Sequence, residues 1–407
     1  MERNVTCCIA GGGPAGMMLG VLLARAGIDI LVLEKHRDFL RDFRGDTIHP
    51  STLEIMDELG WLDEFLTLPH QKVPDLVARF GKTSLRIADF SHLPVKAPYI
   101  AMMPQWDFLN FLVRKGSAYP NFKIAMEAPA SGLVFEDDRV AGVTAKGHSS
   151  PLTIRADLVV AADGRHSTLR PAAGFVAQDF GAPMDVLWFR LSRKPGDTEQ
   201  TQARFDAGAI FVMLNRGDYW QCAFVIAKNA DEQIRSQGLA AFRAKVAALL
   251  PFDGARANDI ASLDDVKLLR VQVDRLSKWC RPGFLCIGDA AHAMSPVGGV
   301  GINLAVQDAV ASANILVEPL REKRLTLANL EAVQARREFP TRVTQRLQLA
   351  MQNAIIAPAL VSTGNVRPPL LVRLIAGIPG LNRLPARAIG LGVRPEHVAG
   401  VIRAARG

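Results

Sequence analysis

Cysteine and aromatic residues are scarce in this chain of 407 residues, and neither forms a pattern that supports metal binding or nucleic-acid recognition. The five cysteines fall mostly in apolar, strand-like runs without a CxxC spacing. We therefore interpret them as reduced core residues and expect a cytoplasmic protein. Aromatic residues make up 7% of the chain, and few lie near its dispersed lysines and arginines. Nucleic-acid binding is thus disfavoured despite the net charge of +8, and attraction of an anionic cofactor is the simpler explanation.

Long uncharged hydrophobic runs are also absent, as is a charged leader followed by an apolar stretch. We therefore expect no integral membrane segment and no signal peptide. Because 49% of the residues are hydrophobic, the chain can bury a sizeable core and form two closely joined domains.

A dinucleotide-binding pattern is present near the N-terminus. Val5–Ala10 predicts a buried strand, a glycine-rich turn leads into an apolar helix, and a second strand ends at Glu34. Gly11, Gly13 and Gly16 occupy the three glycine positions of the fingerprint, and Glu34 lies where an acid accepts hydrogen bonds from an adenosine ribose. This order favours an adenine dinucleotide and leaves the choice between FAD and NAD open.

Two further apolar strands end in glycine and aspartate. Leu158–Ala162 runs into Asp163-Gly164, and Phe284–Ile287 runs into Gly288-Asp289. Closely spaced glycines then precede a helix predicted for Ile302–Leu316. Glycine permits positive φ and close approach of a flat ligand, while a helix N-terminus offers unpaired N–H groups. A glycine-rich turn before an ordinary helix is the alternative.

Together, these motifs resemble the three fingerprints of the FAD-dependent aromatic hydroxylases, the single-component flavoprotein monooxygenases similar to para-hydroxybenzoate hydroxylase. The motifs run from Gly11 to Asp308. The resemblance implies an α/β fold with a Rossmann-like FAD-binding domain, an inserted β-sheet substrate domain and a helical C-terminal region. The expected boundaries are 1–72, 100–174 and 280–365 for the FAD-binding domain, 73–99 and 175–279 for the substrate-binding sheet, and 366–407 for the C-terminal helices.

The resemblance also implies the reaction and the groups that bind the cofactors. It implies FAD as cofactor, NAD(P)H as reductant and O2 as co-substrate. NAD(P)H would bind without a Rossmann domain of its own. The implied reaction is hydroxylation of a phenolic or similar electron-rich small molecule through a flavin C4a-hydroperoxide. Arg165 or His166 is implied as a neighbour of NAD(P)H. The implied cofactor-binding residues are Gly11, Gly13, Gly16, Glu34, Lys35, Arg44, Gln105, Asp163, Asp289, Pro296, Gly299, Gly301, Ile302 and Asn303.

The substrate site is predicted from bulky side chains on the strand-like segments between Val176 and Lys278, which a helix over 240–250 covers. The predicted substrate-binding residues are Trp188, Phe211, Met213 and Trp220, with plain core packing as the alternative for each. The candidate catalytic residues are His49, Asp46 and Tyr219 as possible bases, and Pro296 at the border of the isoalloxazine. No metal ligand is predicted.

Three local patterns carry further expectations. Ser51–Glu54 predicts a capping box, and Pro340 predicts an interruption in a long helical pattern over 325–356. In the C-terminal tail, Leu370–Ile375 and Val401–Arg403 are amphipathic and basic. We expect both segments to pack against the protein, with contact to a membrane surface or the substrate entrance as alternatives.

Other functions stay open at this point. Within the same fold, an FAD-dependent reductase or dehydrogenase of a polyprenyl-type substrate is the main alternative, whereas a halogenase is disfavoured because the chain has no WxWxIP sequence. A flavin-binding protein without turnover and a basic membrane-associated module are weaker alternatives. The partner is expected to be a small aromatic molecule, and a homodimer is one option for the oligomeric state.

Overall fold

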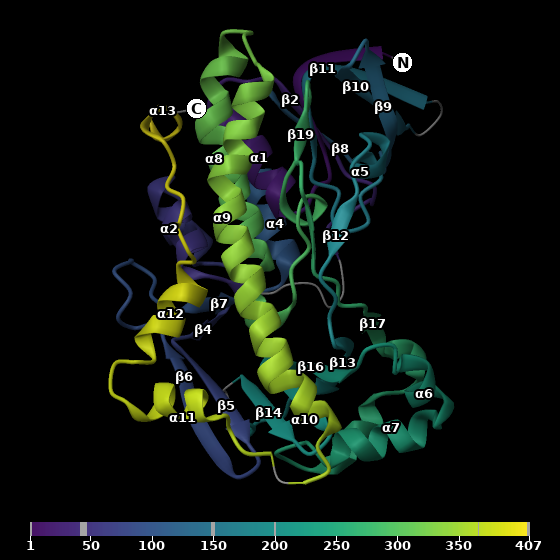
Figure 1. The fold of residues 1–407 in the computed structure, drawn as a ribbon, viewed down its shortest axis with the longest axis vertical. Helices are drawn as coiled ribbons and strands as arrows, with labels where there is room; N and C mark the ends of the chain where they lie inside the picture. The colour runs from purple at the N-terminus through teal and green to yellow at the C-terminus, as the bar shows by residue number, and fades with distance from the viewer. Residues whose placement is uncertain (1, 41–46, 148–150, 199–200, 365, 405–407) are drawn as a thin grey trace.

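The computed structural model describes residues 2–40, 47–147, 151–198, 201–364 and 366–404. Two large sheets lie one above the other in Figure 1, and a long helix, α9 (Leu327–Met351), runs from the side of the upper sheet down to the lower one. The upper sheet has eight strands in the described residues, and the lower one has seven.

The eight-stranded sheet has the order β19-β20-β11-β1-β2-β8, with the hairpin β9–β10 paired to β11. Its central strands are parallel and almost wholly apolar, because helices cover them. The bounds are β1 Glu2–Ala10, β2 Ile30–Leu33, β8 Phe122–Ala125, β9 Ala130–Glu136, β10 Arg139–Lys146, β11 Pro151–Ala161, β19 Cys280–Arg281 and β20 Phe284–Cys286.

Three helices pack around this sheet: α1 (Pro14–Arg25), α4 (Gln105–Gly116) and α8 (Gly301–Arg321). Gly20 lets α1 approach β2 closely, since a Cβ at this position would lie 3.0 Å from a methyl group of Val32. In the described part of the chain, one helical stretch, Val297–Arg321, is long and apolar enough to cross a membrane, but 83% of its most apolar part is buried. Its composition is therefore explained by its place in the core.

The seven-stranded sheet has the order β17-β13-β16-β15-β14-β5-β6. The prediction that 73–99 contributes strands to another sheet is confirmed, because β5 pairs with β14. The bounds are β5 Asp75–Phe80, β6 Thr83–Asp89, β13 Met184–Ser192, β14 Gln202–Asp206, β15 Ala209–Asn215, β16 Tyr219–Ala227 and β17 Lys267–Leu269.

The two faces of the seven-stranded sheet have different coverings. One face packs against α7 (Gly238–Ala247), which confirms the helix predicted over 240–250. The other face packs against Val297 and against Ile356 and Ala359, which follow α9. The shorter helices are α2 Pro50–Glu58, α3 Leu62–Phe65, α5 Leu169–Ala172, α6 Asp231–Ser236 and α10 Ala357–Val361. The shorter strands are β3 Thr47–Ile48, β4 Gln71–Val73, β7 Ile100–Met102, β12 Ala177–Asp179 and β18 Asp274–Leu276. Short 3-10 helices lie at Gly254–Asp259, Leu263–Asp265, Gly288–Ala290 and Val297–Gly299, and a π-helical segment lies at Gln352–Ile356.

Two local predictions are wrong. The predicted capping box does not form, because α2 begins one residue earlier at Pro50, with His49 as its N-cap. Proline suits this first helical position, since its missing N–H group needs no partner there. The predicted interruption at Pro340 is also absent, since α9 continues through this buried proline to Met351. Tertiary packing thus holds the helix together despite the lost hydrogen bond.

The C-terminal helices are α11 (Leu370–Gly377), α12 (Arg383–Gly390) and α13 (Gly400–Arg403). The expectation that Val401–Arg403 packs against the protein is confirmed, because Ile402 is fully buried. α11 also packs against the protein, through the buried Val372, but Leu370 and Leu371 are 68% and 67% exposed. The predicted division into domains stays a proposal.

Candidate active site

The motif segments leave the eight-stranded sheet side by side. Ala10 is paired in register with Leu33 on β2 and with Ala161 on β11, and Ala161 is paired with Cys286 on β20. Neighbouring strands lie about 4.8 Å apart, so the four strand ends fit within roughly 15 Å. The fingerprint glycines, Glu34, Asp163 and Gly288-Asp289 therefore meet at one edge, as ligand sites do in open parallel sheets.

The three fingerprint glycines have different surroundings. Gly11 has a φ of 111°, and a Cβ there would lie 2.2 Å from the carbonyl oxygen of Ala162. At Gly16 a Cβ would lie 2.0 Å from the carbonyl oxygen of Gly11. Gly13, by contrast, has a φ of −76° and no neighbouring atom within 4 Å of a Cβ. The fold itself thus requires Gly11 and Gly16, whereas Gly13 keeps space clear at the start of α1.

Glu34 is held beside the glycine turn. Its side chain is buried, and its two oxygens accept hydrogen bonds from the backbone N–H groups of Gly12 and His36, both at 3.0 Å. Lys35 follows as an exposed residue, and Gln105 is half-buried in the first turn of α4. The carboxylate is therefore fixed where the fingerprint places a ribose. Arg44 and Asp46 lie outside the described residues.

Asp163 has one oxygen in use and one oxygen without a partner. Its Oδ2 accepts hydrogen bonds from the backbone of Thr168 and Leu169, at 2.8 and 3.3 Å. Its Oδ1 is buried and has no hydrogen-bond partner among the described residues. A buried, unpaired carboxylate oxygen is costly, so this atom fits a site at which a polar ligand completes the structure.

Arg165 connects the second and third motifs. Its Nη2 donates to Oδ2 of Asp289 at 3.1 Å, and both side chains are partly exposed, at 23% and 30%. Its Nη1 is buried and has no partner among the described residues. His166 next to it is exposed. The basic and acidic groups expected to neighbour NAD(P)H and the ribityl chain are thus brought together.

The glycine-rich segment has two consecutive residues in the left-handed backbone conformation before α8. Gly298 and Gly299 have φ values of 78° and 64°, and half-buried Pro296 precedes them. The carbonyl oxygen of Gly299 accepts a hydrogen bond from the Thr47 hydroxyl at 2.7 Å. From Gly301, α8 begins without a side-chain cap. Its first N–H groups therefore suit an electron-rich ligand atom.

Asn303 is fixed in the first turn of α8, where Ile302 is buried next to it. Its Oδ1 accepts hydrogen bonds from the hydroxyls of Ser51 and Thr52 on α2. The Ser51 hydroxyl, which the sequence suggested as a helix cap, instead orients the asparagine together with Thr52. This contact was not predictable, because it joins positions about 250 residues apart.

His49 is completely buried between two carbonyl groups. Its Nδ1 lies 2.9 Å from the carbonyl oxygen of Ile389, and its Nε2 lies 3.1 Å from that of Gly299. Burial lowers the pKa of His49 to about 4, although both carbonyl contacts favour the protonated ring. The ring is therefore neutral at pH 7 and donates to one of the two carbonyls. These contacts argue against His49 as a base for the substrate and in favour of a role in positioning Gly299.

A buried charge network supports the Gly288 turn. Asp308 accepts hydrogen bonds from the backbone N–H of Gly288 at 3.0 Å and from Nε of Arg337 at 2.9 Å, and it lies 2.6 Å from Nε2 of His292. Burial raises the pKa of Asp308, but His292 and Arg337 more than offset this effect and hold the pKa below its usual value. Arg337 also pairs with Glu396 in the C-terminal segment. Arg337 and Glu396 lie outside the sequence motifs, so no local pattern predicted their part in this network.

Three of the four predicted substrate-binding residues lie on the face of the seven-stranded sheet that packs against α7. Phe211, Met213 and Trp220 are buried in the cluster that packs against α7. Side chains alternate between the faces of a strand, and Trp188 belongs to the opposite face, where it is half-buried in the same cluster as Val297. The packing thus favours core roles for Phe211, Met213 and Trp220, and it places Trp188 next to the glycine-rich segment.

Two polar residues lie towards the turn between β15 and β16. Tyr219 is half-buried, with the Arg190 guanidinium 4.8 Å from its ring centroid. Gln221, which sequence reasoning missed, is 4% exposed and shares the face of Trp188, because it lies two residues from Ala223, the cross-strand partner of Trp188. Its Oε1 accepts a hydrogen bond from Arg216, and its Nε2 has no partner among the described residues.

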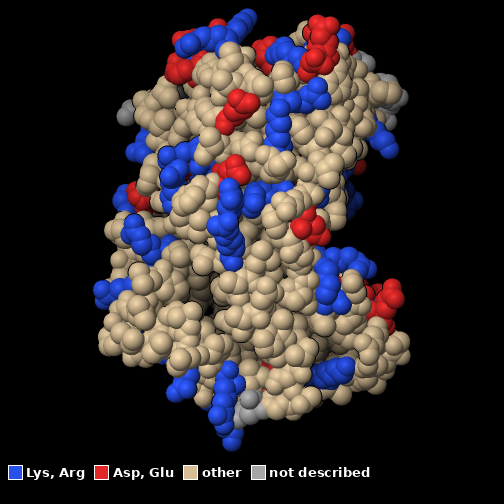
Figure 2. All heavy atoms as spheres, viewed as in Figure 1, with Lys and Arg blue, Asp and Glu red and all other residues tan. Residues whose placement is uncertain are grey.

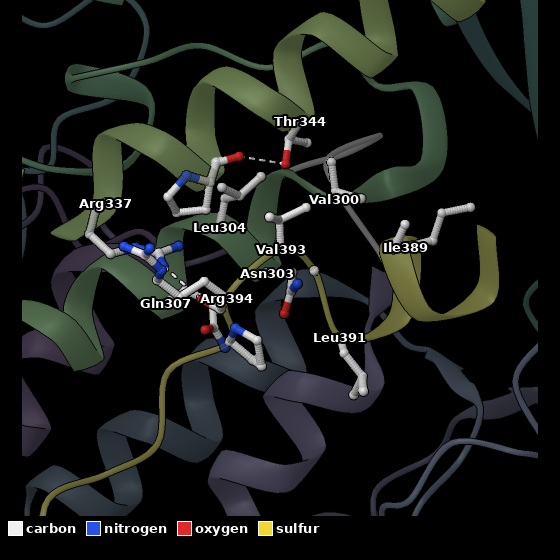
Figure 3. A pocket seen from close by; sticks show the side chains of 14 residues that line it. Val300, Asn303, Leu304, Gln307, Arg337, Thr344, Ile389, Leu391, Val393 and Arg394 are labelled. Atoms are coloured by element: carbon white, nitrogen blue, oxygen red, sulfur yellow. Dashed lines mark hydrogen bonds between the residues drawn. The ribbon is translucent and has the colours of Figure 1, made fainter. Parts of the chain in front are cut away.

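A pocket lies between α8, α9 and the segment 388–395, with an empty volume of about 320 Å³ that is partly open to solvent. Figure 3 shows Val300 and Ile389 on one side of it, Arg337 and Gln307 on the other, and Leu304 between them. The surface in Figure 2 is also hollowed between α12 and the lower part of α9. The pocket is lined by Val300, Asn303 and Leu304 at the start of α8.

Other chemistries find little support in the part of the chain that the structure covers. There, no group of three or more His, Cys, Asp or Glu side chains could hold a metal ion. The five cysteines are buried and free, and burial raises the pKa of Cys8 to about 12 and that of Cys280 to about 11. These thiols are protonated at neutral pH and are poor nucleophiles.

Comparisons with known proteins agree with this geometry. A family model described as FAD binding domain matches residues 4–347. The 6-methylpretetramide 4-monooxygenase of Streptomyces rimosus is 32% identical over 366 residues, which cover 89% of this chain and 86% of that protein. The para-nitrophenol 4-monooxygenase of a Pseudomonas species is 25% identical over 329 residues, which cover 79% of this chain and 80% of that protein. The crystal structure of p-nitrophenol 4-monooxygenase PnpA from Pseudomonas putida matches with a TM-score of 0.76 at 21% identity, covering 97% of this chain and 100% of that one.

Proposed function

This chain belongs to the family of FAD-binding flavoprotein monooxygenases, and on that premise we propose that it hydroxylates a phenolic or similarly electron-rich aromatic molecule with NAD(P)H and O2. The names of two relatives support an aromatic substrate, since one acts on para-nitrophenol and the other on 6-methylpretetramide. The observation that carries the proposal is the meeting of three sequence motifs at one edge of the parallel sheet.

The residues at this edge fit FAD. Gly13 keeps the start of α1 open, Asp163 has an unpaired buried oxygen, and α8 begins without a side-chain cap. We propose that the glycine turn, Glu34 and Lys35 hold the adenosine diphosphate half, with Gln105 and Asp163 next to the pyrophosphate. The residues proposed for the ribityl chain and the ring are Asp289, Pro296, Gly299, Gly301, Ile302 and Asn303.

When bound and reduced by NAD(P)H, FAD would activate O2, so that one oxygen atom is inserted into the substrate and the other leaves as water. The protein itself stabilises negative charge and excludes water from the site. The uncapped N-terminus of α8 favours negative charge that develops beside it. The apolar sheet face that carries Trp188 keeps water away from the glycine-rich segment.

We propose that Trp188 and Gln221 contact the substrate from the sheet. Trp188 offers an apolar surface, and the unpaired Nε2 of Gln221 can donate a hydrogen bond to a substrate oxygen. Tyr219 and Asp46 stay as candidate bases for a phenol, whereas both nitrogens of His49 already face carbonyl groups.

Turnover with oxygen monitoring tests the proposal. We expect purified protein to show flavin absorbance and to oxidise NADH or NADPH in the presence of a phenol, with matching O2 uptake and a hydroxylated product. A folded protein that ignores added FAD would refute the cofactor assignment. Substrate-dependent oxidation of NAD(P)H without O2 uptake would instead support the reductase alternative.

A further inference from the structure

An apolar surface patch lies at the far end of the seven-stranded sheet, on and around α11. Val372 anchors this helix by packing against Ala78 and Phe80 of β5. The other large side chains point away from the protein: Leu370, Leu371, Leu374, Ile378 and Leu384 are between 45% and 68% exposed. Large apolar residues gathered in this way mark an interaction surface more often than isolated exposed ones do.

The patch is surrounded by positive charge. The sequence between Glu338 and Glu396 contains no aspartate or glutamate, but it contains seven arginines: Arg342, Arg346, Arg367, Arg373, Arg383, Arg387 and Arg394. In Figure 2, the surface over α11 and α12, at the lower left, shows Lys and Arg among uncharged residues and no acidic side chain. The nearby acids Asp75 and Asp89 on the neighbouring strands are each paired with Arg86.

We propose that this patch, formed by α11 and the start of α12, docks the protein on an anionic membrane surface. An amphipathic helix with leucines on one side and arginines beside them binds at the boundary between lipid headgroups and acyl chains. The guanidinium groups of the arginines favour anionic headgroups. The methylene part of each arginine side chain can lie along the apolar part of the lipid.

A second copy of this chain fits the patch less well. A symmetric dimer through this surface would place the same arginines opposite one another, and Arg367, Arg373, Arg383 and Arg387 are all exposed. Like charges at a close interface weaken association, and no acidic side chain lies within 363–395 to neutralise them. Charge complementarity thus selects an anionic bilayer.

Vesicle binding tests the proposal with the full-length protein. Vesicles of phosphatidylcholine alone and of phosphatidylcholine with phosphatidylglycerol serve as neutral and anionic probes in a sedimentation assay. We expect binding to anionic vesicles that weakens as salt increases, because the charge contribution is screened. Leu371→Asp should reduce the partition coefficient at least tenfold, and Arg373→Gln about fivefold.

Val176→Asp is the matched control, because Val176 is also an exposed apolar residue, at 84%, but lies outside the patch. It should bind vesicles like the unmodified protein. Circular dichroism and monooxygenase activity without vesicles check that each variant is folded. Absence of binding to anionic vesicles at low salt, or equal binding by Leu371→Asp, would overturn the proposal. A dimer in solution that Leu371→Asp dissociates, without vesicle binding, would assign the patch to self-association instead.

Discussion

Replacement of Gly13 by alanine separates cofactor binding from folding. Gly13 has a φ that alanine adopts readily, and no protein atom lies within 4 Å of the added Cβ. The free energy of unfolding of the protein without cofactor should therefore stay unchanged or rise by about 0.4–1 kcal/mol, because alanine restricts the unfolded chain. FAD binding should weaken, since the methyl group occupies space that the pyrophosphate needs. Overpacking of this kind costs about 1–3 kcal/mol, or roughly 5- to 150-fold in Kd.

Flavin fluorescence titration measures the Kd, and urea denaturation of the protein without cofactor measures the free energy of unfolding. Gly11→Ala is the control, because it should lower the free energy of unfolding of the protein without cofactor, which Gly13→Ala should not. Its Cβ would lie 2.2 Å from the backbone of Ala162, at a φ of 111°, so the protein itself should be destabilised before any cofactor is added. If Gly13→Ala binds FAD with unchanged Kd, the glycine turn does not face the pyrophosphate and the reasoning is refuted.

Three further predictions follow from the buried groups. Because burial lowers the pKa of His49 to about 4, the unfolded state binds a proton more readily, and the free energy of unfolding should fall as the pH drops from about 6.5 to 4. The loss of unfolding free energy is about 2 kcal/mol at pH 5. Urea denaturation at several pH values should show that the His49→Gln variant lacks this loss. An identical pH dependence in the variant would contradict the assignment of the loss to His49. Asp308→Asn leaves Arg337 buried without a full partner, so it should lower the free energy of unfolding by about 3–5 kcal/mol in the same assay. Glu396→Gln keeps the bond between Asp308 and Arg337 and should cost less. A loss below about 1 kcal/mol for Asp308→Asn would argue against the network. Trp220→Ala should destabilise the core by about 3–5 kcal/mol, whereas Trp188→Ala should chiefly lower kcat/KM; a Trp188→Ala enzyme with unchanged kinetics would remove this residue from the proposed substrate site.

The cofactor edge was predictable because its determinants are local. Each motif combines an apolar strand with the residues that directly follow it, and parallel pairing places those residues next to one another. Gly16 is required by a close backbone contact within the same turn, whereas Gly11 is required by its contact with Ala162 at the end of the neighbouring strand β11. Sequence spacing therefore carries most of the information on this part of the site.

The substrate face was less predictable because both sides of its sheet are apolar. Trp188 and Phe189 are adjacent in β13 and equally hydrophobic, yet one packs towards Val297 and the other beneath α7. Alternation reveals the faces of a strand only when one of them is polar. The contact of His49 with Ile389 joins residues 340 positions apart, which no local pattern records.

The exposure of α11 was hidden for a different reason. A helix that docks on the protein and one that docks on lipid share the same amphipathic pattern, so Leu370 and Ile402 look alike in the sequence. Only the tertiary contacts separate them, since Ile402 is fully buried and Leu370 is 68% exposed.

The order of strands in the eight-stranded sheet has a consequence for how the protein is made. β1 leaves the ribosome early, but β20, which completes the edge that holds the cofactor, follows roughly 270 residues later. At a synthesis rate of about 5–20 residues per second, this delay lasts roughly 15–55 s. During that time the apolar strand β1 can pair first with β2 and, about halfway through, with its other neighbour, β11, whereas β20 arrives last. A complete cofactor edge is therefore available to flavin only after β20, its last parallel strand, has been synthesised.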